Sequence, residues 1–515
     1  MQGQPANAKI QFYIEMRIIY RIITTENKIS KIKYKIIEPA YSGDYLRDSM
    51  FKLIMRKISL LIFSVSLVLV AGCNTPKEQL LMFDGHFEAS NYQAAAAYAE
   101  KNIKNKTNPA REDLLWTLQA AAAKRALKDY AGSTGEFDKA EEFLKFYDLR
   151  FSAADNMAAV AVNDNVVPYK GQEYDGVMAN VYKALNFLAQ GNYDLAKVEF
   201  NRALDRQRRT KEHFEKEIAK TRESIEKAQY GSLVNDPNTQ RTIQDRYPQL
   251  YEYEPYRDYI NPFVTYLASI YFNATGDIST ARNLLKETVG LVPENKSIAN
   301  EFEETEAAIF TGRTIKNTVW VIFENGLGPR KEEFRIDLPL FIVTDRVQYA
   351  GIALPRLEYR ESAFPYLLIE ANGVQYSTTV VGSMDRVISS EFKKDYEGIL
   401  ARAIISTAGK TLTQYALTNQ YDENNRRSED GAYIGSIMVA LYSFLTNAAD
   451  VRIWTALPKE FQTARLQMPQ NKALKITAVN GETFDIRLPD CDNVLVYIKI
   501  TQRGSPPICD VIPFG

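Results

Sequence analysis

Histidine and cysteine, the side chains that most often act as nucleophiles, bases and metal ligands, are scarce in this chain. The 515 residues include two histidines, His86 and His213, and three cysteines, Cys73, Cys491 and Cys509. No HExxH, CxxC, GxSxG or P-loop motif occurs. We therefore expect no enzymatic activity, no cofactor and no metal site. Aspartate and glutamate are plentiful, so hydrolysis by a pair of carboxylates stays open as an alternative.

Cys73 is the cysteine whose sequence context predicts a specific reaction. It follows a run of apolar and small residues, 58–71, which is right for a signal-peptide core and short for a membrane span. Arg56 and Lys57 supply the positive flank. The run ends in Leu69-Val70-Ala71-Gly72-Cys73, which resembles the lipobox of bacterial lipoproteins. There the peptidase needs small residues, and the cysteine thiol receives a diacylglyceryl group. The alternative is a buried helix that ends in a cysteine by chance.

The position of this segment in the chain is unusual, because a signal peptide should begin a chain. Residues 1–49 precede Met50, are rich in Ile, Lys and Tyr, and show neither a helical nor a strand period. We expect translation to start at Met50 or Met55, with 1–49 an incorrectly assigned leader and 50–72 the signal peptide. The alternative is a cytoplasmic arm with an uncleaved anchor. By analogy with Gram-negative lipoproteins, Asn74 favours the outer membrane and a chain that faces the periplasm.

Cys491 and Cys509 flank the last apolar run of the chain, NVLVYIKI. An exported chain meets an oxidising compartment, where two cysteines can pair. A disulfide between them would close a short loop and contribute about 3 kcal/mol if unstrained. The alternative is two separate thiols.

The segment 73–312 carries apolar residues at the i, i+3, i+4 and i+7 spacing of helices that pack in pairs. Four stretches share this spacing around a short turn, which is typical of tetratricopeptide-like (TPR-like) hairpins. The alternative is generic helical hairpins without a repeat. We expect the packing positions to be Ala184, Phe187, Gly191, Tyr193, Ala196, Phe200 and Ala203 in the clearest copy, and Gly276, Ala281 and Leu285 in a second.

Two stretches interrupt these predicted repeats. Arg206–Gln229 reads as a separate helix with charges of both signs, which usually form a solvated face, and with a thin apolar stripe of Phe214, Ile218 and Ile225. The segment 247–259 is rich in tyrosine. It fits a packed, hydrogen-bonded loop better than a binding interface.

Strand patterns dominate residues 313–515. The pattern changes at Thr318: VWVIFENG, residues 319–326, reads as a buried strand that ends in a turn, and the glycine-rich turn 324–330 reads as a hairpin. Asn372-Gly373 predicts a type I′ turn, and Asn480-Gly481 predicts a second hairpin. Helices are expected over 384–420 and 431–447. We predict an α+β domain whose helices cover one face of a mainly antiparallel sheet and which folds by itself.

Composition sets the wider limits. The chain is 45% hydrophobic and 25% charged, with net charge −1, which is typical of globular domains. It lacks the basic runs of a nucleic-acid-binding surface, so we expect no nucleic-acid partner. The predicted fold class is α+β overall, with an all-α TPR-like array at 73–312 followed by the α+β domain at 313–515.

Five blocks of the chain together resemble an uncharacterised family of bacterial TPR-like lipoproteins. The genes of that family tend to lie near a small lipoprotein that activates penicillin-binding proteins, which implies a role in the envelope or in peptidoglycan assembly. No functional residue is implied, because none is known for the family, and the leader before Met50 falls outside the resemblance. The blocks are residues 168–203, 261–277, 323–341, 384–404 and 454–469.

These observations predict a lipid-anchored interaction or scaffold protein of the cell envelope. Stacked helix pairs make a concave surface that usually holds a peptide or protein. We therefore expect a membrane contact through the lipid on Cys73 and one or more protein partners in the envelope. One alternative is a hydrolase that acts on peptidoglycan or glycan through carboxylates, and another is a structural subunit of an envelope machine.

Overall fold

The computed structural model describes residues 75–105, 109–150, 168–227, 234–251, 259–339, 349–423 and 449–514, together with residues 232, 254 and 256. Cys73, the leader, the signal peptide and the helix predicted at 431–447 lie outside these residues. Thr75–Gly515 form one compact unit. Among the residues described, none of the helices combines the length and the hydropathy that a bilayer crossing requires.

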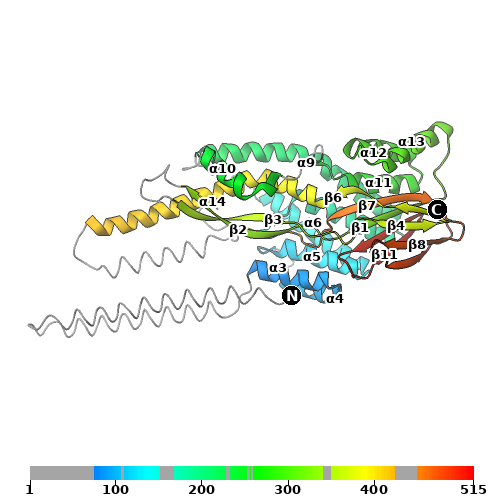
Figure 1. Ribbon diagram of the computed structural model, residues 1–515, viewed down its shortest axis with the longest axis horizontal. Helices are drawn as coiled ribbons and strands as arrows, with labels where there is room; N and C mark the ends of the chain where they lie inside the picture. Colours follow the sequence, from blue (N-terminus) through cyan, green and yellow to red (C-terminus); the bar gives the residue numbers. More distant parts are fainter. Residues whose placement is uncertain are drawn as a thin grey trace, which may run out of the picture. The chain divides into compact units, whose positions relative to one another are not determined.

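Helical hairpins form the first part of the unit, as the apolar spacing predicts (Figure 1). Helices α3 and α4, α5 and α6, α8 and α9, and α11 and α12 pack in pairs, and α13 packs on α12. The helices of this part are α3 (Pro76–Glu88), α4 (Tyr92–Asn102), α5 (Asp113–Ala126), α6 (Tyr130–Arg150), α8 (Glu173–Ala189), α9 (Tyr193–Lys227), α10 (Pro237–Arg246), α11 (Pro262–Ala274), α12 (Ile278–Leu291) and α13 (Lys296–Thr311), with a 3₁₀ turn at Pro248–Tyr251.

Glycines in the left-handed conformation make two of the hairpin turns. Gly191 has φ of 74° after α8, and Gly276 has φ of 88° after α11. A residue with a Cβ atom is strained at such φ values, so glycine lets the chain reverse within few residues. The next helix then begins at a capping side chain: Asp277 accepts a hydrogen bond from the Thr280 N–H at 3.1 Å.

Small and bulky side chains alternate where the paired helices meet. Ala196, Phe200 and Ala203 of α9 are fully buried, as is Ala184 of the facing helix α8. Ala281 and Leu285 are fully buried in α12, whereas Phe187 and Tyr193 are half-buried at the ends of their helices. The expected packing positions inside the helices therefore lie at the contacts between them, whereas Gly191 and Gly276 are exposed in the turns.

The charged stretch that we expected as a separate helix is instead the continuation of a hairpin helix. Helix α9 runs unbroken for 35 residues. Its apolar stripe is covered, since Phe214 and Ile225 are buried and Ile218 is half-buried. The described part of the tyrosine-rich segment is packed, as predicted: Tyr247 and Tyr256 are buried and accept hydrogen bonds from backbone N–H groups.

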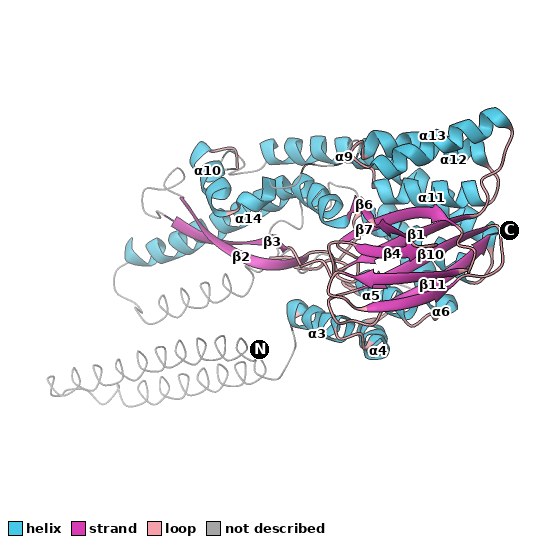
Figure 2. Cartoon of the chain, turned by 45° about the vertical axis from the view of Figure 1, so that its right-hand side comes forward, coloured by secondary structure: helices cyan, strands magenta, loops and turns pink. Residues whose placement is uncertain are grey.

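The strands form two stacked sheets and a separate ribbon (Figure 2). The central sheet has the order β11-β10-β1-β7-β6, the second sheet β5-β4-β8-β9, and β2 pairs with β3. All strand pairs are antiparallel except β1 with β10. The strands are β1 (Thr318–Asn325), β2 (Arg330–Pro339), β3 (Tyr349–Glu358), β4 (Leu367–Ala371), β5 (Val374–Ser377), β6 (Thr379–Ser383), β7 (Glu460–Gln467), β8 (Ala473–Ala478), β9 (Thr483–Arg487), β10 (Asn493–Ile500) and β11 (Ile508–Phe514).

The central sheet is buried on both faces, which is why β1 reads as a continuous apolar run. Val319, Val321 and Phe323 point into a core shared with the second sheet. The alternate residues, Trp320 and Ile322, point into a core shared with the helices of the N-terminal region. The unit therefore has three layers, with helices on one side of the central sheet and the second sheet on the other.

This arrangement corrects one expectation. Helix α14 (Met384–Glu423), predicted at 384–420, packs mainly against the ribbon strand β3 and only slightly on the central sheet. The sheet face that we expected it to cover is covered largely by the hairpin helices, whose residues share one core with the strands. Without those helices this face would meet water, so residues 313–515 are not expected to fold by themselves.

Both Asn-Gly hairpins form where they were predicted. Asn372 and Gly373 have φ of 52° and 76° between β4 and β5, as a type I′ turn requires. Between β8 and β9, Gly481 has φ of 89° in a three-residue loop closed by Ala478 and Glu482. The mainly antiparallel α+β fold class is confirmed.

The glycine-rich turn after β1 is not a hairpin, in contrast to the prediction. β1 pairs with β10 and β7, whereas the strand after the turn, β2, pairs with β3. The Gly326 N–H donates to the Ile500 carbonyl at 2.9 Å, and the Gly328 N–H donates to the Leu457 carbonyl at 2.8 Å. The turn thus passes the chain from the central sheet into the ribbon.

Overpacking the helix contact tests this architecture. Ala203→Leu places a larger side chain in a fully buried position between α8 and α9, so it should lower the free energy of unfolding by about 1 to 3 kcal/mol. Denaturant titration followed by circular dichroism measures the change. Ala307→Leu, on the exposed side of α13, is the matched control and should change stability by less than about 0.5 kcal/mol. Equal effects of the two substitutions would contradict the packing described.

Candidate functional site

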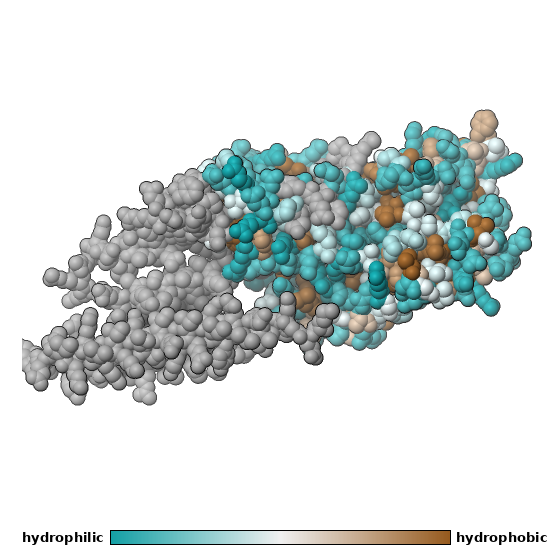
Figure 3. All heavy atoms as spheres, viewed as in Figure 1, coloured by the Kyte–Doolittle hydropathy of each residue, from teal (hydrophilic) through white to brown (hydrophobic). Residues whose placement is uncertain are grey.

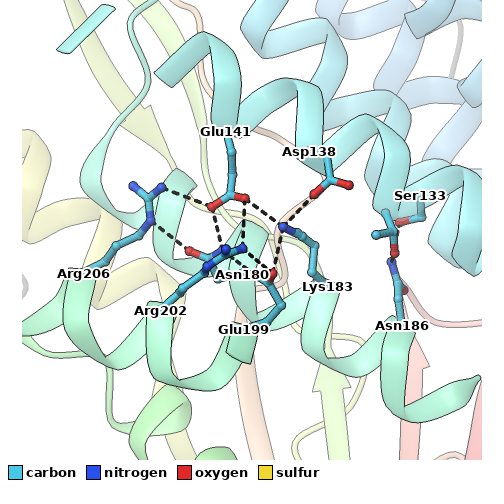
Figure 4. A network of polar contacts seen from close by, with 10 residues as sticks. Ser133, Asp138, Glu141, Asn180, Lys183, Asn186, Glu199, Arg202 and Arg206 are labelled. Carbon is cyan, nitrogen blue, oxygen red and sulfur yellow. Dashed lines mark hydrogen bonds and ion pairs between the residues drawn. The ribbon is translucent and has the colours of Figure 1, made fainter. Parts of the chain in front are cut away.

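A buried polar network between α6, α8 and α9 is one cluster that could carry chemistry (Figure 4). The Lys183 ammonium lies 2.7 Å from Asp138, 2.8 Å from Glu141 and 3.0 Å from Glu199. Burial alone would lower the pKa of Lys183, but these carboxylates raise it. The side chain is 2% exposed and fully paired. The network therefore joins three helices through a buried cation, and its one largely exposed carboxylate, Asp138, is paired with that cation.

A larger site is a cavity of about 700 Å³ that is walled by α9, the first turn of α8 and α14. The end of α6, the segment that precedes α8, the ribbon strands, Asp450 and Arg452 complete its lining. The lining carries eight Lys and Arg side chains and six Asp and Glu side chains, together with His213. Such a density of charge in one concave space is the strongest candidate for a functional site within the described residues.

One wall of the cavity is fixed by a carboxylate at the start of a helix. Glu391 of α14 accepts hydrogen bonds from the backbone N–H groups of Glu173 at 2.8 Å and Tyr174 at 3.4 Å. These are the first two residues of α8, whose N–H groups have no partner within the helix. Burial raises the pKa of the Glu391 carboxyl well above its usual range. With its amide nitrogen facing the two carboxylates, the Gln172 side chain donates hydrogen bonds to Glu391 and to Asp395.

A chain of charged groups crosses the cavity from α8 to α14. His213 Nε2 lies 3.3 Å from the Glu173 carboxylate and 3.2 Å from the Glu217 carboxylate. The Lys394 ammonium is 2.7 Å from Glu217 and 2.9 Å from Asp395. The hydrogen bond with Glu217 raises the pKa of His213. Burial would raise the pKa of Glu217, but His213 and Lys394 outweigh it and lower that pKa to about 2.

Two further carboxylates lie near the start of α8, and one of them, Asp450, lines the cavity. Asp450 forms a two-pronged ion pair with Arg452, with both contacts at 2.8 Å. Burial would raise the pKa of Asp450, but the guanidinium outweighs it and lowers that pKa. Asp175 accepts hydrogen bonds from the Tyr169 hydroxyl at 2.6 Å and from the Gln172 N–H at 2.9 Å. Burial raises the pKa of Asp175 to about 6, and its Oδ1 atom has no hydrogen-bond partner among the described residues.

The arrangement suits binding better than bond cleavage. A pair of carboxylates that hydrolyses a glycosidic bond needs space for the bond between them. Here the His213 imidazole lies between Glu173 and Glu217 and contacts both. Within the described part of the chain, no group of three or more His, Cys, Asp or Glu side chains could hold a metal ion.

The cysteines predicted to pair lie at opposite ends of the last antiparallel hairpin. Cys509 is opposite Ile498 on β10, whereas Cys491 comes before β10 begins. The two positions are seven residues apart along the strand, roughly 23 Å at about 3.3 Å per residue. A disulfide needs Cα atoms within about 7 Å, so the predicted bond is wrong and both residues are free thiols. Burial raises the pKa of the Cys509 thiol to about 11.

Sequence reasoning missed the cavity because it treated the charges of α9 as a solvated face. Those that line the cavity recur every three or four residues and so share one side of the helix. This periodicity, beside an apolar stripe, is the signal that could have indicated a second element packed along the helix. The lining residues of α9 with polar side chains are Arg206, Arg209, His213, Glu217, Lys220, Thr221 and Ser224.

Comparison with known proteins gives no assignment for the chain. No family model matches it, and neither the curated proteins nor the solved structures include a significant match.

The charge chain makes stability depend on pH in a definite direction. The pKa of His213 is raised in the folded protein. Its contribution to the free energy of unfolding is therefore complete below about pH 6.5, the ordinary histidine pKa, and is lost as the pH rises through the folded pKa. His213→Gln should therefore lower the melting temperature at pH 5 and leave it nearly unchanged at pH 9. Glu217→Gln removes the main partner, so His213→Gln should have little effect at either pH in that background. A His213→Gln effect that is independent of pH would rule out the ion pair.

Proposed function

We propose that the chain is a lipid-anchored binding protein of the bacterial cell envelope. The proposal rests mainly on the position of the first residue of the compact unit relative to Cys73. The unit starts at Thr75, two residues after the cysteine of the lipobox-like sequence. Thr75 and Glu78 form a capping box, in which each accepts a hydrogen bond from the other's backbone N–H, so helix α3 starts at once. A cleavage site before Cys73 would release this unit whole and put the lipid at its first residues.

The charged cavity is the part of the unit that we propose to hold a ligand or a segment of a partner in the envelope. Its charges come from elements far apart in sequence, which the fold holds in place through buried contacts such as Glu391 with α8. The face drawn in Figure 3 supports a polar mode of recognition, because its apolar residues are scattered rather than gathered in one large patch.

Hydrolysis by carboxylates is the second candidate. Glu173 and Glu217 lie in the same cavity with pKa values shifted in opposite directions, upward for Glu173 by burial and downward for Glu217. Such divergence is typical of an acid and base pair. The imidazole between them makes binding the better-supported proposal.

Replacing the thiol tests the anchor. Cys73→Ser removes the sulfur atom that would receive the diacylglyceryl group, so the variant should show no lipid labelling and should stay unprocessed. Metabolic labelling with a fatty acid, followed by gel analysis of membrane fractions, measures both. Cys491→Ser, which alters a thiol inside the folded unit, is the control and should be labelled normally. Normal labelling and maturation of Cys73→Ser would refute the lipoprotein proposal.

Charge reversal at the rim tests the cavity. Arg209 lines the cavity, and its side chain is 70% exposed and paired with Asp205 on the same helix. Arg209→Glu should therefore reduce the yield of cross-linked partner several-fold while leaving the melting temperature nearly unchanged. Arg222→Glu is the matched control, since Arg222 lies on α9 with its side chain 65% exposed but does not line the cavity. Equal yields from the two variants would exclude the cavity as the partner site.

A further inference from the structure

Helix α3 leaves one apolar strip facing solvent. Leu81 is 44% exposed and Met82 is 51% exposed, and Gly85 is exposed one turn further on. Helical spacing puts these residues on the same side of α3, away from Leu80, Phe83 and Phe87, which are buried in the core. Among the charged side chains near the strip, Asp84 is buried and Glu78 lies one turn earlier.

The charges at the start of α3 do not oppose contact with a lipid surface. Lys77 is exposed and would favour anionic headgroups. The Glu78 carboxylate is turned back toward the start of the helix, where it accepts the Thr75 N–H at 3.0 Å. A membrane-facing surface of this kind, with apolar residues beside a basic one, is typical of helices that lie in the interface of a bilayer.

The covalent chain sets how far this strip can be from the proposed lipid. Thr75 follows Cys73 by two residues, which is at most about 7 Å of extended chain. Met82 follows seven residues later in α3, a rise of about 10 Å in a helix. The strip is therefore held within about 18 Å of the acylated cysteine, which is less than the thickness of the hydrocarbon core of a bilayer, about 30 Å.

Helix α3 is also fixed to the rest of the unit, so it is not free to turn its apolar side inward. The Arg330 guanidinium of β2 lies 2.6 Å from Asp84 and 2.5 Å from Glu88. The Arg360 guanidinium lies 3.1 Å from Glu88. Asp84 is 2% exposed, and a buried ion pair of this kind strongly resists being broken from one side.

We propose that the strip formed by Leu81, Met82 and Gly85 rests on the surface of the membrane that holds Cys73. The inference depends on the proposed lipid anchor and adds an orientation to it. The chain would be held flat through α3 rather than extended on a flexible tether, because no linker separates the lipid from the fold. Its cavity would then keep a fixed direction relative to the bilayer.

Tryptophan fluorescence can test this contact, because the natural Trp116, Trp320 and Trp454 are all at most 2% exposed. Met82→Trp is compared with Val374→Trp, whose position is also 51% exposed. The two positions lie toward opposite ends of β1. Val374 is two residues after Asn372, whose side chain accepts a hydrogen bond from the Gln470 N–H near the start of β1. Helix α3 is instead paired with Arg330, which follows the end of β1. The lipidated proteins are reconstituted in vesicles of phosphatidylethanolamine and phosphatidylglycerol, with or without brominated acyl chains that quench tryptophan at short range.

Flotation with the vesicles reports on the anchor, and quenching reports on the contact. We expect both variants to float, with a loss of emission several times larger for Met82→Trp than for Val374→Trp. Flotation with equal quenching at the two positions would overturn the membrane contact and leave the anchor intact, as expected if α3 binds a protein instead. Failure of both variants to float would overturn the proposed anchor and this inference with it.

Discussion

The carboxylate of Glu324 is buried between the central sheet and helix α8. Much of the fold depends on the hydrogen bonds and the ion pair that compensate this buried charge. The carboxylate accepts hydrogen bonds from the hydroxyls of Tyr182 at 3.1 Å and Tyr497 at 2.5 Å, and it pairs with the Lys499 ammonium. A second buried pair lies beside it, where Arg125 of α5 is 3.3 Å from Asp510 of β11. A buried charge costs several kcal/mol unless partners surround it, so these contacts require the helices and the sheet to be in place together.

This constraint explains why two patterns that look like separate domains form one unit. The apolar residues of the central strands alternate between a core with the second sheet and a core with the hairpin helices. Neither region can bury its own face completely. The cavity has the same dependence, because its lining comes from α8 and α9 of the first region and from α14 and the ribbon of the second. A ligand in the cavity would therefore contact both regions at once.

Local features were predictable from the sequence, whereas contacts between distant segments were not. Asn372-Gly373 and the packing of Ala196 and Ala203 follow from turn chemistry and helical period, which depend on neighbouring residues only. The cavity depends on Glu391 meeting the start of α8 across more than two hundred residues, and no local pattern encodes that pairing. The disulfide prediction was wrong for a similar reason, since proximity in sequence was read as proximity in space across a strand that separates the two cysteines.

The central claim is that the helices and the sheets of Thr75–Gly515 unfold together as one cooperative unit. Only then would the proposed lipid on Cys73 fix the whole unit, cavity included, to the membrane. Native-state hydrogen exchange of the whole protein is the most direct test of that claim. The account predicts that the slowest amides of α8, β1 and β10 exchange through one shared opening, with the same free energy and the same dependence on denaturant. Exchange of α8 at a clearly lower free energy, while β1 and β10 stay protected, would contradict it.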